Sequence, residues 1–297
     1  MFSGSWVAVV TPFNNNAVDE AALADLVNWH VEKGTNGIVA VGTTGESPTL
    51  SHEEHHKVVE ICVKAANKRI PVMAGTGSNS TDEAIDLTAH AKKAGADAVL
   101  LVNPYYNKPT QEGLYRHYMA IADAVDIPQI VYNIPGRTGG KIETSTMARL
   151  ATHPNIVGLK DACGDLAYTS EIISRTSSDF SVLSGDDGLT LPMMSIGAKG
   201  VISVAANVVP DKIAALTAAA LAGDFGAARE IHYSMWDLMN SMFYETNPIP
   251  VKTALAMMGR IREEFRLPLC QMGQANRERL QTVMQKCGLL AEEAARA

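Results

Sequence analysis

Residues 98–132 contain a short apolar run, AVLLV (98–102), then an amphipathic segment, QEGLYRHYMAIADA (111–124), and then a second apolar run, QIVY (129–132). Short apolar runs bounded by turn residues are typical of buried strands, and the helical hydrophobic period between them predicts a strand–helix–strand unit. Units of this kind pair as parallel strands joined by right-handed crossovers. The stretch therefore predicts an α/β fold with a parallel sheet.

The same alternation extends in both directions. Ser51 and Glu54 form a capping box at one helix start, and Gly34 and Gly95 stand where glycines commonly follow a helix. About eight units in succession favour a closed (β/α)8 TIM barrel, with an open doubly wound sheet as the alternative. Helices are predicted at residues 20–33, 52–67, 82–93 and 111–124, and strands at 6–10, 37–41, 71–74, 98–102, 129–132, 156–159, 180–183 and 200–203.

The alternation stops after about Gly223, and the remaining helical patterns cover residues 224–244, 250–258 and 275–287. No low-complexity linker separates the two parts. We therefore expect a catalytic barrel over residues 1–223 and a C-terminal helical extension over residues 224–297 that packs on the barrel.

Composition excludes several classes of protein. The 297-residue chain has a net charge of −7, which argues against a nucleic-acid surface. No apolar run approaches the roughly 18 residues of a membrane span, and the first residues lack the basic and apolar regions of a signal peptide. Because the four cysteines form no CxxC pair and no disulfide framework, we expect a reducing cytoplasm.

Lys160 ends the apolar run of residues 155–159, which reads as a buried strand. Burial disfavours the charged ammonium, lowers the pKa of the amine, and so produces a neutral nucleophile. The structural alternative is a lysine that marks the strand exit and pairs with Asp161.

The other strand ends carry side chains that suit such an amine. Active sites of (β/α)8 barrels form at the C-terminal ends of the strands. Imine chemistry there needs a desolvated amine, hydroxyl groups that move protons and a cation for a carboxylated substrate. The strand ends supply all three, in Gly42-Thr43-Thr44-Gly45-Glu46-Ser47, Asn103-Pro104-Tyr105-Tyr106, Tyr132-Asn133-Ile134-Pro135-Gly136-Arg137-Thr138 and Ser184-Gly185-Asp186-Asp187.

These motifs, together with Gly158-Leu159-Lys160-Asp161, resemble the pyruvate-dependent class I lyase family, which includes dihydrodipicolinate synthases and N-acetylneuraminate lyases. The resemblance runs from Phe2 to Leu269. It implies an imine between Lys160 and pyruvate. Arg137 favours the synthase branch, which condenses pyruvate with L-aspartate 4-semialdehyde to 4-hydroxy-tetrahydrodipicolinate, the first committed step of diaminopimelate and lysine biosynthesis. The alternative is another pyruvate-dependent aldolase, such as an N-acetylneuraminate lyase, which is expected to lack this arginine.

The resemblance also implies a role for each site residue. Arg137 binds the carboxylate of the semialdehyde, and no metal or organic cofactor is needed. Tyr106 reaches across a tight dimer interface, so a homo-oligomer is implied, commonly a dimer of dimers. The implied catalytic residues are Lys160, Tyr132, Thr43 and Tyr106, and the implied substrate-binding residues are Thr44, Arg137, Ile202 and Gly185.

A second site for L-lysine as a feedback inhibitor is implied by the same resemblance. The matching positions are Ser47, Pro48, His52, His55, Asn79, Glu83 and Tyr105. Pro48 departs from the small residue of the family pattern, and Asp161-Ala162-Cys163 stands where Glu-Ala-Thr is usual.

Two further motifs have other interpretations. His52-Glu53-Glu54-His55-His56 matches the H-E-x-x-H pattern of zinc metalloproteases, but it starts a helix and has no convincing third ligand downstream. Gly75-Thr76-Gly77 begins like a dinucleotide-binding turn but lacks the third glycine and a clear acidic partner.

Overall fold

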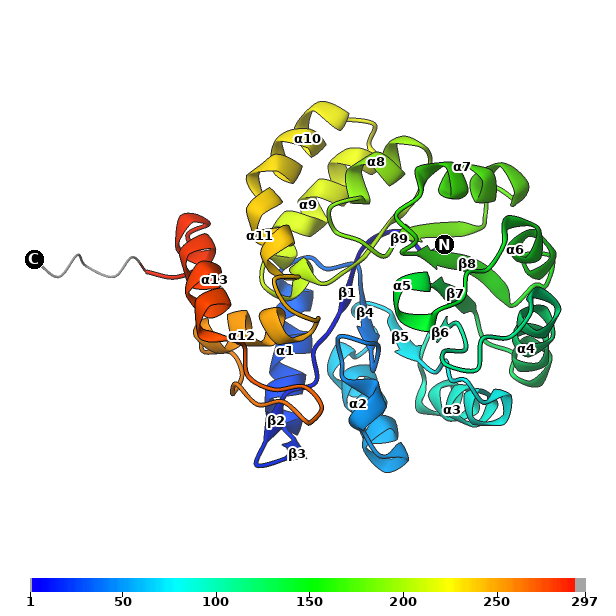
Figure 1. The fold of residues 1–297 in the computed structure, drawn as a ribbon, viewed down its shortest axis with the longest axis horizontal. Helices are drawn as coiled ribbons and strands as arrows, with labels where there is room; N and C mark the ends of the chain where they lie inside the picture. The colour runs from blue at the N-terminus through cyan, green and yellow to red at the C-terminus, as the bar shows by residue number, and fades with distance from the viewer. Residues whose placement is uncertain (1, 292–297) are drawn as a thin grey trace, which may run out of the picture.

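The computed structural model describes residues 2–291 and contains a closed barrel of parallel strands (Figure 1). The strands pair in the order β1-β10-β9-β8-β7-β6-β5-β4. This closure confirms the predicted TIM barrel and excludes the open sheet. The barrel strands are β1 Gly4–Ala8, β4 Gly37–Ala40, β5 Val72–Gly75, β6 Ala98–Val102, β7 Gln129–Asn133, β8 Ile156–Asp161, β9 Ser181–Ser184 and β10 Gly200–Ser203.

Helices surround the barrel and connect its strands (Figure 1). The capping box of Ser51 and Glu54 opens α2, and Gly95 ends α3 with φ of 92°, as the sequence predicts. The helices between the strands are α1 Glu20–Glu32, α2 His52–Ala66, α3 Thr81–Ala94, α4 Gln111–Ala124, α5 Pro135–Thr138, α6 Thr144–Leu150, α7 Leu166–Arg175 and α8 Thr190–Ser195. After β10 come η2 Ala205–Asn207 and α9 Pro210–Leu221.

Two apolar cores hold these layers together. Val7 of β1 belongs to the larger core between strands and helices, whereas its neighbours Trp6 and Ala8 belong to a smaller core with Tyr132 and Ile202. Side chains alternate between the two faces of a strand, so the smaller core fills the barrel interior. The barrel interior is therefore filled by side chains.

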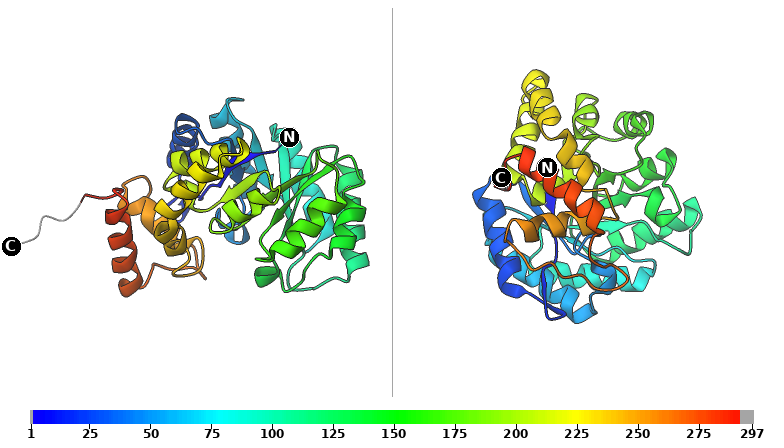
Figure 2. Two further views of the ribbon diagram at one scale, coloured as in Figure 1. Left: turned by 90° about the horizontal axis from the view of Figure 1, so that it is seen from above. Right: turned by 60° about the vertical axis from the view of Figure 1, so that its left-hand side comes forward.

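Residues after α9 form α10 Phe225–Ser234, α11 Trp236–Ser241, α12 Ile249–Met257 and α13 Gln274–Lys286. α12 and α13 lie at one side of the barrel, opposite α4 and α6 (Figures 1 and 2). The guanidinium of Arg260 stacks on the ring of Trp29 from α1, 3.6 Å from its centroid. The assignment of 1–223 and 224–297 to two separate units stays a prediction.

One local prediction was wrong, and one element was not predicted at all. The single helix predicted over residues 224–244 is interrupted at Met235, whose backbone (φ −111°, ψ 1°) is not helical. A short hairpin of β2 Phe13–Asn14 and β3 Ala17–Val18 was not predicted. Its turn residues Asn15 and Asn16 both have positive φ, which asparagine tolerates better than most residues.

No helix within residues 2–291 is long and apolar enough to cross a membrane.

Candidate active site

A cavity of about 460 Å³ opens at the C-terminal ends of the barrel strands. Its lining unites side chains from β7 and β8, the turns after β4 and β9, and the helices α2, α3 and α5. The residues predicted from the sequence that line it are Thr43, Thr44, Ser47, Pro48, His52, His55, Glu83, Tyr105, Tyr132, Arg137, Lys160 and Gly185.

Lys160 lies on β8 with 6% of its surface exposed. Burial lowers the pKa of its amine to about 7; Asp187 opposes this shift and Arg137 adds to it. The predicted alternative of an ion pair with Asp161 does not form, because neighbouring residues of a strand point to opposite faces. An amine with this pKa is largely neutral at slightly alkaline pH, which is what a nucleophilic lysine requires.

Tyr132 pairs with Lys160 across the β7–β8 register. The Lys160 Nζ atom lies 4.1 Å from the centroid of its ring. Burial raises the pKa of the Tyr132 phenol above its usual range, and Arg137 partly offsets the shift. The phenol therefore keeps its proton at neutral pH and has one to donate next to the amine.

The turn after β4 carries Thr43 and Thr44 into the cavity. Thr44 is almost fully buried, and its Oγ1 accepts a hydrogen bond of 3.0 Å from Asn247 Nδ2. Asn247 comes from the segment that precedes α12, so a residue far along the chain orients this threonine.

Arg137 lies on α5, the short helix that follows β7, and remains exposed at the cavity mouth. Its Nη2 donates to the Asn247 carbonyl oxygen at 3.2 Å. Within residues 2–291 the other guanidinium nitrogens have no hydrogen-bond or ion-pair partner, which leaves them for a carboxylate at the mouth.

Asn247 thus contacts both Thr44 and Arg137, and sequence reasoning missed it. Its Oδ1 is buried and has no hydrogen-bond partner among the described residues. The residue belongs to a stretch that carries the family resemblance, Asn247-Pro248-Ile249-Pro250-Val251-Lys252, but no strand-end rule points to it.

A buried ion pair holds the turn after β4 that carries Thr43 and Thr44. The Lys252 amine of α12 pairs with the Glu46 carboxylate, and their side chains are 0% and 1% exposed. Lys252 also lies over the Phe13 ring, 4.3 Å from its centroid. Because Glu46 follows the Thr43–Gly45 turn directly, the C-terminal segment helps to position the predicted pyruvate-binding residues.

Three predicted residues do not line the cavity. Ile202 is buried in the barrel interior beside Tyr132 rather than exposed to the cavity. Tyr106 is 91% exposed, with φ of 70°. A single chain therefore does not bring Tyr106 to Lys160, and its predicted role needs a second chain. Asn79 is the third, and its Nδ2 donates to the Tyr105 carbonyl oxygen at 3.2 Å.

The residues predicted to bind lysine gather at the end of the cavity formed by α2 and α3. His52 Nε2 contacts Glu83 Oε1 at 2.8 Å, and Ser78 donates to the other carboxylate oxygen of Glu83. The Ser78 hydrogen bond, followed by the contacts with His52, lowers the pKa of Glu83, so this carboxylate is anionic at neutral pH. An anion at a cavity wall suits a ligand with an ammonium group.

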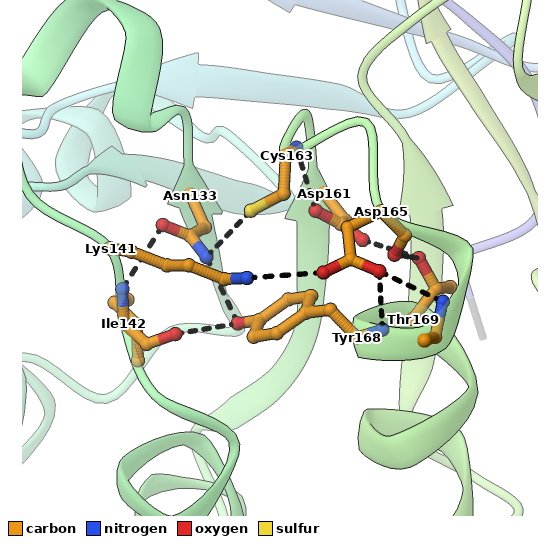
Figure 3. A network of polar contacts seen from close by, with 9 residues as sticks. Asn133, Lys141, Ile142, Asp161, Cys163, Asp165, Tyr168 and Thr169 are labelled. Carbon is orange, nitrogen blue, oxygen red and sulfur yellow. Dashed lines mark hydrogen bonds and ion pairs between the residues drawn. The ribbon is translucent and has the colours of Figure 1, made fainter.

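A polar network links β7 and β8 to α7 and to the segment before α6 (Figure 3). Asn133 Nδ2 donates to Tyr168 Oη at 2.9 Å, and Tyr168 Oη donates to the Ile142 carbonyl oxygen at 2.9 Å. Asp161 accepts from Thr169 Oγ1 at 2.6 Å and from the Cys163 N–H at 2.9 Å. Residues next to Tyr132 and Lys160 are thereby anchored, and Asp161 and Cys163, which depart from the family pattern, both belong to this network.

The H-E-x-x-H match and the Gly75-Thr76-Gly77 turn both have structural roles. His52 turns to Glu83, whereas His55 Nε2 contacts the Gly75 carbonyl oxygen at 2.8 Å, so the two histidines do not converge. The Gly77 backbone lies so close to β6 that a Cβ there would be 2.2 Å from Val102 N. Strand packing therefore accounts for this glycine without a nucleotide.

Comparison with known proteins matches residues 1–287 to the dihydrodipicolinate synthetase family. The 4-hydroxy-tetrahydrodipicolinate synthase of Thermodesulfovibrio yellowstonii is 59% identical over 98% of this chain and 100% of its own length. The crystal structure of dihydrodipicolinate synthase from Aquifex aeolicus superimposes with a TM-score of 0.97, at 55% identity, over 98% of this chain and 100% of that one.

A further similar structure contains a ligand. The chloride-inhibited dihydrodipicolinate synthase of Acinetobacter baumannii, complexed with pyruvate, has a TM-score of 0.96 and 50% identity over 98% of this chain and 100% of that one. Similarity of this extent over nearly the whole length leaves one assignment: the chain belongs to the dihydrodipicolinate synthetase family.

Proposed function

We propose that this enzyme, a lyase of the class I aldolase type, condenses pyruvate with L-aspartate 4-semialdehyde to 4-hydroxy-tetrahydrodipicolinate. The observation that carries the proposal is the buried Lys160 amine with a pKa of about 7 beside Tyr132 in the strand-end cavity. The names of the relatives and the pyruvate complex of the Acinetobacter baumannii enzyme support it. The product belongs to diaminopimelate and lysine biosynthesis.

The reaction begins when the neutral Lys160 amine adds to the ketone carbon of pyruvate. Loss of water leaves an imine, and loss of a proton from the methyl group gives an enamine. Tyr132 exchanges protons with these intermediates, relayed through Thr43 and Tyr106. Thr44, oriented by Asn247, holds the pyruvate carboxylate. Gly185 lines the pocket, and Ile202 packs beside Tyr132 in the barrel interior below it.

The enamine carbon then attacks the aldehyde carbon of the second substrate. This step restores the imine, and the aldehyde oxygen takes up a proton and becomes a hydroxyl group. Arg137 grips the carboxylate of that substrate with its guanidinium, which suits a planar anion. The substrate's own amine next attacks the imine carbon, closes the ring and releases Lys160 as a free amine. The electrons return to the lysine nitrogen, so the cycle needs no external oxidant or reductant.

Reductive trapping tests the imine. Incubation with pyruvate and borohydride should add one reduced pyruvate to the Lys160 peptide, measured by mass spectrometry. Lys160→Ala should abolish the adduct, while Lys92→Ala on the exposed face of α3 should not change it. An unmodified Lys160 peptide in the wild-type protein would refute the proposal.

Arg137 tests the choice of aldehyde. Because a charge-assisted hydrogen bond contributes about 1.5–3 kcal/mol, Arg137→Ala should lower kcat/KM for the semialdehyde by roughly 10- to 100-fold. Trapping with pyruvate alone should persist. Turnover of N-acetylmannosamine in place of the semialdehyde would support the N-acetylneuraminate lyase alternative.

We also propose that L-lysine binds at the α2–α3 end of the cavity as an inhibitor. The Glu83 carboxylate would hold an ammonium group, with Ser47, His52, His55, Asn79 and Tyr105 around it; Pro48 shapes the loop. Glu83→Gln should weaken lysine binding in calorimetric titration. Glu60→Gln, which removes a carboxylate that pairs with His90 outside this end, is the matched control. Equal affinity in both variants would exclude the site.

The assembly is proposed to be a homo-oligomer, a dimer of dimers. Tyr106 supports this, because an exposed tyrosine enters catalysis only if a second chain covers it. Light scattering of the purified protein measures the mass, and a monomer with full activity would remove Tyr106 from the relay. The four free cysteines are consistent with the proposed location in the cytoplasm.

A further inference from the structure

A buried carboxylate stands behind the cavity wall and takes no part in the steps above. Asp187 follows β9 and is 2% exposed. The preceding residue, Asp186, is exposed and accepts a hydrogen bond from the Gly188 N–H at 2.8 Å. Two adjacent aspartates therefore have opposite environments, and only one of them is taken out of water.

The protein holds one oxygen of Asp187 firmly. Its Oδ2 accepts hydrogen bonds from the Val204 N–H at 3.0 Å and the Ala205 N–H at 2.9 Å, at the end of β10. Its Oδ1 is buried and has no hydrogen-bond partner among the described residues. Burial raises the pKa of this carboxyl, and the hydrogen bonds it accepts oppose that rise. A carboxylate oxygen buried without a hydrogen-bond partner costs folding free energy, and a functional role of the charge would explain why it is kept.

The turn that carries this carboxylate lies beside Lys160. Gly185, two residues earlier, lies so close that a Cβ there would be 3.1 Å from Lys160 Cε. Gly185, Val204 and Lys160 all line the same cavity. None of the described carboxylates comes within the 4.0 Å of an ion pair with Lys160 Nζ, and Asp187 is the anion whose charge acts on this amine.

Other polar groups around Lys160 do not duplicate this charge. Arg137 is a cation, Tyr132 offers its ring and a protonated phenol, and Asp161 on the same strand turns to Thr169. During the reaction the Lys160 nitrogen becomes a positively charged imine. A fixed negative charge outside contact distance leaves the free amine mostly neutral but stabilises that cation.

We propose that Asp187 is a positioning residue whose fixed carboxylate is the counter-charge of the cationic imine on Lys160. The inference rests on the proposed function. The Val204 and Ala205 N–H groups and the Ser203 hydroxyl hold Asp187. The charge is therefore preorganised and needs no movement during the reaction.

The test compares Asp187→Asn with Asp186→Asn, which removes an equal charge one residue away at the surface. Loss of a fixed charge several Å from the imine is expected to raise the pyruvate concentration for half-maximal trapping by about 10- to 100-fold in the first variant. The pH midpoint of adduct formation should also move to lower pH, because the charge of Asp187 raises the pKa of Lys160. The second variant should match the wild type in both readouts.

A purely structural role would lower stability and leave the pH midpoint in place. Unchanged trapping and midpoint in a folded Asp187→Asn variant would overturn the inference. If that variant does not fold, infrared difference spectra of the wild type with and without pyruvate provide the test. A protonated carboxyl band that appears with the imine would overturn the inference about Asp187. A carboxylate that persists would support it. Failure of wild-type trapping would instead refute the proposed function.

Discussion

Replacement of Lys252 by methionine should destabilise the enzyme through the Glu46 carboxylate that it leaves behind. The two side chains are 0% and 1% exposed, so neither charge can be solvated once its partner is gone. Methionine has nearly the length of the lysine stem and retains contact with the Phe13 ring. The change therefore removes the charge and little of the packing.

The expected cost is large. Breaking a buried ion pair by removal of one partner typically costs about 3–5 kcal/mol. At roughly 2 °C per kcal/mol for a chain of this size, Tm should fall by about 6–10 °C. The double variant Glu46→Gln/Lys252→Met leaves no buried charge at this position, and we expect it to recover most of that loss.

The assay is thermal unfolding and pyruvate trapping of the wild type, Lys252→Met and Glu46→Gln/Lys252→Met. Trapping belongs to it because Glu46 ends the turn that carries Thr43 and Thr44, so a shifted turn should weaken pyruvate binding. Arg175→Met is the matched control: its partner is Glu171, their side chains are 50% and 43% exposed, and loss of such a pair costs less than about 1 kcal/mol.

Two results would refute this reasoning. One is a Lys252→Met protein as stable as the Arg175→Met control. The other is a double variant less stable than the single one, which would show that the pair contributes more than the cost of its own burial.

Three further outcomes are expected. Gly77→Ala should lower the free energy of unfolding in urea by about 1–3 kcal/mol, because its Cβ would lie 2.2 Å from Val102 N. The control Gly140→Ala has open space around its Cβ and should not change stability. Burial lowers the pKa of His30 to about 3 and of His55 and His117 to about 4. The unfolded chain takes up these protons first on acidification, so stability should fall from pH 6.5 to about 4, by up to about 1.4 kcal/mol per pH unit for each histidine; an unchanged slope in His30→Gln would contradict this. Iodoacetamide should label exposed Cys270 and spare Cys62, whose burial raises its pKa to about 12, and a labelled Cys62 in the native protein would be contrary to expectation.

Regular elements were predictable because their signals are local. β6, β10 and α4 have the predicted bounds, and the other barrel strands differ by one or two residues at their ends. The interruption at Met235 was not visible, since residues 224–244 keep a helical pattern throughout. The β2–β3 hairpin did have a signal, the consecutive asparagines of its turn, but its strands are too short for a period of two to appear.

The sequence by itself determined the barrel, the strand-end position of Lys160 and the residues gathered at its mouth, because hydrophobic periods set the elements and parallel strands share one C-terminal edge. Only the tertiary structure decided what holds that site. Asn247 meets Thr44 across 203 positions of the chain, and Lys252 meets Glu46 across 206. Such contacts arise when the C-terminal helices pack against the closed barrel, and no local pattern encodes them. The same holds for the buried Asp187, whose hydrogen-bond donors Val204 and Ala205 follow β10.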